Sequence, residues 1–126
     1  PIKTLQILFV LFSLVYFPIE ARAMLIDDTG AKRIAWIEAL SICENPTATP
    51  RILDTNNRYS YGKLMFQKTT FDMYGEKYGL PHDDIYSDEQ QELIALNMLN
   101  DGLWRHWRTC AKKTTQKLGP YPTTST

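Results

Sequence analysis

The sequence predicts a mainly α-helical domain of the α+β class, in which a small β-hairpin lobe lies between the first and second helices. Apolar residues recur at intervals of three and four in four segments, which is the spacing of one helix face. One stretch, residues 51–62, instead combines short extended runs with turn residues. With 126 residues, the chain has the length of one domain. A cleft between the helices and the hairpin would suit an extended polymer.

The first predicted helix runs from about Thr29 to Cys43. Asp28 or Thr29 suits its N-cap, where a side-chain oxygen accepts a hydrogen bond from a free backbone N–H. Helical spacing places four residues on its inner face: Ile34, Ile37, Leu40 and Ser41. Asn45 and Pro46 then break the helix.

Glu44 lies at the end of this helix and shares its apolar face, because Leu40 and Ser41 precede it by four and three positions. A carboxyl group held against apolar neighbours is harder to ionise and keeps its proton to a higher pH. Such a group can act as a general acid. The alternative interpretation is a solvated glutamate at a helix end, because most surface glutamates have no such role.

The hairpin is predicted over Arg51 to Gly62, with its turn at residues 55–57, where asparagine tolerates the left-handed conformation. Tyr59 and Tyr61 alternate with Ser60, as in a half-buried strand. The two tyrosine rings are expected either to stack on a ligand or to pack the hairpin.

Two helices are predicted after the hairpin. The first begins at Thr69 or Thr70, both suitable N-caps, and ends at Gly79. The second begins at a capping box, Ser-Asp-Glu-Gln at residues 87–90, and ends at Asn-Asp-Gly, residues 100–102.

The last predicted helix carries Leu103, Trp107 and Cys110 on one face at helical spacing. This stripe indicates that Trp107 belongs to the core. Trp104 and His106 fall off the stripe, and we expect them to line the cleft.

Residues 1–23 have the pattern of a secretory signal peptide. A single positive charge, Lys3, precedes an almost unbroken apolar run from Leu5 to Phe17, and Ala-Arg-Ala at residues 21–23 is a small-residue cleavage site. The run is short for a membrane-spanning helix. An uncleaved membrane anchor is the alternative, because Arg22 is atypical directly before a cut.

We therefore expect an exported protein, in the periplasm, the cell wall or the extracellular space, with its folded domain at residues 24–117. Residues 118–126 are expected to form a disordered tail. Cys43 and Cys110 are the only cysteines, and outside the cytoplasm such a pair is more often a disulfide than a metal or redox site. Neither a metal nor a cofactor is predicted.

The charge balance argues against a nucleic-acid partner. Lys plus Arg and Asp plus Glu both number 14, so the net charge is zero, whereas binding driven by phosphates requires a basic face. A local basic cluster at Arg105, Arg108, Lys112 and Lys113 is interpreted as the solvated side of a helix.

Several motifs occur in a fixed order along residues 34–110. They are Cys43-Glu44, the stretch Asn-Arg-Tyr-Ser-Tyr-Gly-Lys-Leu-Met-Phe-Gln at 57–67, Thr-Thr-Phe at 69–71, and residues 102–110 with their tryptophans and second cysteine. This order resembles the lysozyme-like superfamily, and most closely the lytic transglycosylase-like domain shared with resuscitation-promoting factors. The resemblance implies a lysozyme-like helical domain whose hairpin lobe forms a substrate cleft.

The resemblance also implies an activity. Family members cleave the β-1,4 bond between N-acetylmuramic acid and N-acetylglucosamine in peptidoglycan, and Glu44 would act as general acid and then as base. The expected partner is the peptidoglycan glycan strand, bound by a monomer, with membrane contact only through an uncleaved N-terminal segment. The residues expected to contact substrate are Tyr59, Ser60, Tyr61, Met65, Gln67, Thr70 and Trp104.

Two departures from the family pattern concern substrate contacts. Met65 stands where the family usually has a glutamine that binds sugar, and Lys63 stands where glycine is common. Gln67 lies two positions on and would face the same way in an extended stretch, so it could partly compensate.

Alternatives remain open on the sequence alone. Asp54 could be the second carboxylate of a hydrolase, although an aspartate before this turn is more often a turn former. A phage-borne hydrolytic lysozyme would share the fold and Glu44. A non-catalytic peptidoglycan-binding or structural module would share the fold without needing Glu44.

Overall fold

The computed structural model describes residues 28–123. The chain divides into two units, Pro1–Lys32 and Arg33–Thr126. In the first unit, residues 28–32 are helical, and Lys32 Nζ lies 3.4 Å from Asp28 Oδ2. The predicted signal peptide, residues 1–23, lies outside the described residues. Between residues 28 and 123, no helix is both long and apolar enough to cross a membrane.

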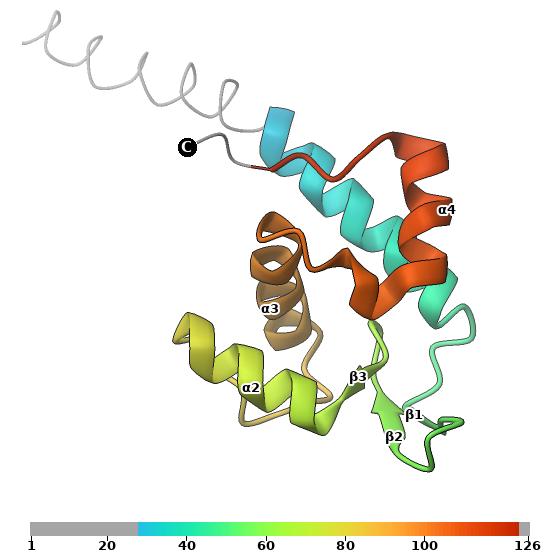
Figure 1. Ribbon diagram of the computed structural model, residues 1–126, viewed down its shortest axis with the longest axis vertical. Coiled ribbons are helices and arrows are strands. Elements are labelled where there is room, and N and C mark those ends of the chain that lie inside the picture. Colours follow the sequence, from blue (N-terminus) through green and yellow to red (C-terminus); the bar gives the residue numbers. More distant parts are fainter. Residues whose placement is uncertain (1–27, 124–126) are drawn as a thin grey trace, which may run out of the picture. The chain divides into compact units, whose positions relative to one another are not determined.

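The second unit belongs to the α+β class, as predicted (Figure 1). Residues 33–44 are helical. The elements that follow are β1 (Arg51–Leu53), β2 (Tyr59–Tyr61), β3 (Phe66–Gln67), α2 (Lys68–Tyr78), α3 (Asp88–Asn100), a 3₁₀ helix (Trp104–Trp107) and α4 (Arg108–Leu118). The strands lie between the end of the helix over residues 33–44 and the start of α2.

The strands form an antiparallel sheet in the order β1-β2-β3. Leu53 pairs with Tyr59 across the predicted hairpin, and Ser60 pairs with Gln67 of β3, a strand that the sequence pattern did not predict. The turn contains Asn57 at a φ of 62°, the left-handed conformation that asparagine accommodates.

The hydrophobic core joins every helix of this unit to the segment between β2 and α2. Its buried members are Trp36, Ile37, Leu40, Leu64, Phe66, Phe71, Ile94, Ala95, Met98, Leu99, Trp107, Cys110 and Ala111. Trp107 is buried, as predicted, and its indole N–H donates to the Leu64 carbonyl oxygen at 2.8 Å.

Ile34 does not belong to the inner face, contrary to the sequence prediction, since it is 68% exposed. This part of the helix packs through Arg33 and Trp36 against the C-terminal segment. Ile34 is rotated by about 100° from Arg33 around the helix and points away from that contact.

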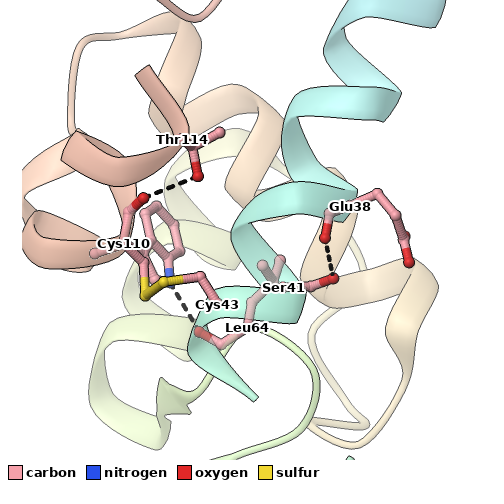
Figure 2. Close-up of a disulfide and its surroundings, with 7 residues drawn as sticks. Glu38, Ser41, Cys43, Leu64, Cys110 and Thr114 are labelled. Atoms are coloured by element: carbon pink, nitrogen blue, oxygen red, sulfur yellow. Dashed lines mark hydrogen bonds between the residues drawn. A yellow bond between two sulfur atoms is a disulfide. The ribbon is translucent and has the colours of Figure 1, made fainter. Parts of the chain in front are cut away.

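The predicted disulfide between Cys43 and Cys110 is present and connects the end of the helix over residues 33–44 to the first turn of α4 (Figure 2). The two cysteines are 67 positions apart in sequence, and closing a loop of that length stabilises the fold by about 4 kcal/mol in the chain-entropy model. A disulfide indicates an oxidising environment, which is consistent with export.

The predicted start of α3 is confirmed, and the predicted start of α2 is not. Ser87 caps α3 by accepting a hydrogen bond from the Gln90 backbone N–H, as the capping box predicts. In contrast, α2 begins one residue earlier than expected, with Gln67 at the N-cap and no side-chain cap. Because Thr69 and Thr70 are already helical, neither serves as the cap.

The predicted disordered tail is packed over residues 119–122. The Trp36 indole N–H donates to the Gly119 carbonyl oxygen at 3.0 Å, and the Arg33 guanidinium donates to the Pro122 carbonyl oxygen at 2.8 Å. Tyr121 meets the Trp36 ring edge-on, with 5.6 Å between the ring centroids. The segment covers an aromatic side chain of the first helix, which the tail's polar composition does not indicate. Residues 124–126 lie outside the described range.

Candidate active site

Glu44 is the last helical residue before Asn45 and is half-buried at the edge of the core. The disulfide of its neighbour Cys43 holds this helix end against α4. Burial raises the pKa of the Glu44 carboxyl group, and the negative charge of Asp54 raises it further. Glu44 therefore keeps its proton to a higher pH than an ordinary glutamate, as a proton donor must.

Asp54 has the opposite character. Its carboxylate accepts hydrogen bonds from the Thr55 backbone N–H at 2.9 Å and from the Ser60 hydroxyl at 2.9 Å. These bonds, together with one from Gln67, lower the pKa of Asp54. The Thr55 bond matches the predicted role in the turn, but the charge of Asp54 also acts on Glu44.

Asn45, interpreted from sequence only as a helix breaker, organises the surroundings of Glu44. Its buried side-chain amide donates to the carbonyl oxygens of Thr49 at 2.8 Å and Gly62 at 2.9 Å, and its oxygen accepts from the Thr49 N–H. One side chain thus connects the helix end, the following loop and the sheet. No local sequence signal distinguishes this asparagine from an ordinary loop residue.

Gln91 holds the same part of the sheet from α3 and was also missed. It is fully buried, accepts from the Leu64 backbone N–H at 2.9 Å and donates to the Tyr61 carbonyl oxygen at 2.8 Å. A Cβ at Gly62 would overlap the Gln91 amide. The signal was available, because Gln91 precedes Ile94 and Met98 by three and seven positions, which puts a polar residue on the core-facing stripe.

A polar cavity of about 240 Å³ opens beside Asp54. It is lined by Asp54, Ser60, Met65, Phe66, Gln67, Thr70, His106 and Trp107. The structure therefore brings together four of the predicted contact residues, Ser60, Met65, Gln67 and Thr70. Glu44 is not among the residues that line this cavity.

Tyr59 and Tyr61 do not share this cavity with Ser60. Successive residues of a strand face opposite sides of a sheet, so the two tyrosines point away from the side where Ser60 meets Asp54. Tyr61 contacts Tyr86 edge-on, with 5.6 Å between centroids, and the Arg51 guanidinium lies 4.6 Å from the Tyr59 ring centroid. The sequence itself indicates this alternation, but all three residues were still expected in one cleft, because the family resemblance implied it.

Trp104 and His106, expected together, lie at different cavities. His106 lines the polar cavity, and burial lowers its pKa, which favours the neutral imidazole. Trp104 instead lines a second, largely apolar cavity of about 540 Å³. The two residues are two positions apart in the 3₁₀ helix, so their side chains point to different sides.

Met65 lines the cavity as expected but adopts a left-handed backbone with φ of 51°, so residues 65–67 are not one extended run. Gln67 cannot simply replace the missing glutamine, because its amide exchanges two hydrogen bonds with the Asn56 amide, at 3.1 and 3.2 Å.

The site thus combines a carboxyl group whose pKa is raised, a second carboxyl group whose pKa is lowered, and a polar cavity beside the second group. Such a pair can donate a proton and stabilise a developing positive charge. Within residues 28–123, no group of three or more His, Cys, Asp or Glu side chains is placed to hold a metal ion. No protein-family model, curated protein or solved structure significantly matches the chain.

Proposed function

We propose that the protein is a peptidoglycan-cleaving muramidase, a lytic transglycosylase that cuts the β-1,4 bond between N-acetylmuramic acid and N-acetylglucosamine. The observation that carries the proposal is the environment of Glu44, in which burial and the Asp54 charge both raise the pKa of a carboxyl group at a helix end. The substrate class rests on the resemblance of the ordered motifs to lysozyme-like domains.

In the proposed reaction, Glu44 first acts as a general acid. Its proton passes to the glycosidic oxygen as the bond from that oxygen to C1 of the muramic acid breaks, and the sugar ring develops oxocarbenium character. Asp54, held ionised by Thr55 and Ser60, contributes a negative potential to this region. That potential favours the positively charged ring.

Glu44 then acts as a base. As a carboxylate it accepts the proton of the muramic acid 6-hydroxyl, whose oxygen bonds to C1 and closes a 1,6-anhydro ring. Glu44 is protonated again, so the cycle needs no second catalytic acid. Water in place of the 6-hydroxyl would give the hydrolysis expected of a phage-borne lysozyme, with Asp54 as the second carboxylate.

Digestion of purified sacculi followed by mass spectrometry of the soluble products tests the proposal. Anhydro-muropeptides support the lytic reaction, and products with reducing ends indicate hydrolysis. Sacculi that bind the protein without releasing fragments would overturn the enzymatic proposal.

A non-catalytic peptidoglycan-binding module is the second candidate. The absence of Glu44 from the lining of the polar cavity, and the thioether of Met65 within that lining, favour it. Binding to sacculi that is unchanged in Glu44→Gln, together with no released product from either protein, would establish this candidate.

A further inference from the structure

The second cavity lies on a surface that the proposed function does not use. It has a volume of about 540 Å³ and is formed by the helix over residues 33–44, α3, α4 and the segments that flank α4. Its lining includes Trp36, Leu99, Trp104, Ala111 and Tyr121. These side chains make the walls mainly apolar.

Two of the three aromatic side chains in the wall, Trp36 and Tyr121, are held in place through their polar atoms. The Trp36 indole N–H is bonded to the Gly119 carbonyl oxygen at 3.0 Å, and the Tyr121 hydroxyl donates to the Leu96 carbonyl oxygen at 3.4 Å. Because these groups are bonded to the backbone, the rings present carbon surface to the cavity. A fixed apolar concavity of this size is typical of sites for small molecules.

The rim of the cavity is cationic. Lys112 lines it and forms no ion pair with any residue of the described part of the chain. Residues 102–126 contain five basic side chains and no acidic one: Arg105, Arg108, Lys112, Lys113 and Lys117. The remaining residues therefore hold 9 of the 14 basic and all 14 acidic side chains. This segregation gives the α4 surface a positive potential that attracts anions.

We propose that this cavity binds an amphiphile with one apolar chain or ring system and an anionic head group. The apolar part would lie against Trp36, Trp104 and Tyr121, and the head group would meet Lys112 at the rim. A free amphiphile and a lipid of a bilayer share this chemistry. The proposal is independent of the peptidoglycan-cleaving activity.

The direct test titrates the full chain with monomeric 12-bromododecanoate and follows quenching of tryptophan fluorescence by the bromine. Two of the three tryptophans, Trp36 and Trp104, line the cavity, so binding there gives saturable quenching. A quaternary ammonium with the same bromododecyl chain is the matched probe of opposite charge. We expect tighter binding of the anion; equal affinities, or no saturation below the micelle concentration, would overturn the proposal.

Neighbouring lysines provide a matched pair of variants. Lys112 and Lys113 are both exposed on α4, but only Lys112 lines the cavity. Lys112→Gln should weaken bromododecanoate binding by up to about fivefold, the upper end for an exposed charge pair, and Lys113→Gln should leave it unchanged. Equal effects would overturn the assignment of the head group.

Thr115→Phe tests the apolar part, because Thr115 is exposed on α4 and lines the cavity, so a ring there would fill it. Saturable quenching should disappear while the melting temperature stays close to that of the parent. Vesicles of phosphatidylglycerol and of phosphatidylcholine distinguish the two sources. Binding to anionic vesicles alone, without saturable quenching by the monomer, would mean surface adsorption and would overturn the proposal.

Discussion

The end of the helix over residues 33–44 carries Glu44, and the hairpin turn carries Asp54. The pKa values of these two carboxyl groups are shifted in opposite directions. Glu44 is half-buried, and burial is the main cause of its raised pKa. Asp54 is exposed and accepts bonds from Thr55 and Ser60, which lower its pKa. A turn offers free backbone N–H groups to an anion, whereas the last turn of a helix leaves only carbonyl groups free. Burial of Glu44 and hydrogen bonding of Asp54 thus move the two pKa values in opposite directions.

Glu44→Gln removes the proposed proton donor and should have the largest effect. We expect release of soluble muropeptides to fall by roughly 10²–10⁴-fold, the range for general acid catalysis. The melting temperature at neutral pH should stay nearly unchanged. The pKa of Glu44 is raised in the folded state, so the free energy of unfolding falls as the pH rises through that pKa and Glu44 ionises. The neutral amide of the glutamine avoids this loss. Glu76→Gln, on the exposed face of α2, is the control; turnover retained by Glu44→Gln would exclude Glu44 as the acid.

Removing the disulfide tests how the helix end is held. A Cys43→Ser, Cys110→Ser double variant should lose a few kcal/mol of the free energy of unfolding, up to about 4 kcal/mol. Because Cys43 adjoins Glu44, activity should decline at lower denaturant concentrations than global unfolding. Denaturation curves measured by circular dichroism and by activity compare the two transitions. Two reactive thiols in the denatured but unreduced parent protein would contradict the disulfide.

Met65→Gln changes a residue that lines the polar cavity beside Asp54. A thioether is a weak acceptor, so a sugar hydroxyl or amide facing Met65 lacks a partner, and one unmade bond costs about 1–3 kcal/mol. The glutamine should tighten binding of soluble glycan fragments or raise turnover. Met73→Gln, on the exposed part of α2, is the control. If Met65→Gln only destabilises the fold, Met65 is a core residue and the family alignment over residues 63–67 is out of register.

Asp54→Asn removes the negative charge of the hairpin turn and should have the smallest effect. The Asp54 charge raises the pKa of Glu44, so its loss should lower that pKa and move the alkaline limb of the pH–activity profile to lower pH. We expect a shift of less than about one unit, since burial is the larger cause. Asp88→Asn, at the start of α3, should not move the limb. An unmoved limb in Asp54→Asn would show that the two carboxyl groups do not interact.

Features governed by local sequence were predictable. The Ser87 capping box, the Asn57 turn and the Trp107 core position follow from neighbouring residues. Contacts between distant segments were not, because spacing along one element does not identify what packs against it. Asn45 and Gln91 meet Gly62 across 17 and 29 residues. Helical spacing indicates that Gln91 is buried, but no local pattern identifies Gly62 as the partner of either residue.

The site was predictable in part for the same reason. Four expected contact residues line one cavity because they follow one another along a single hairpin and helix start. Trp104 lies elsewhere because it is two positions from His106, a spacing that puts the two side chains on different sides of a helical turn. Tyr59 and Tyr61 were grouped with Ser60 although strand alternation alone separates them.

The packing of residues 119–122 should protect this segment from endoproteases. A protease binds its substrate in an extended form, so the Pro122 carbonyl would first have to leave Arg33, Tyr121 the Trp36 ring, and the Gly119 carbonyl the Trp36 indole. Cleavage within the segment should therefore be slow in the folded protein. Heating would speed this cleavage well below the melting temperature if the segment detaches before the domain unfolds.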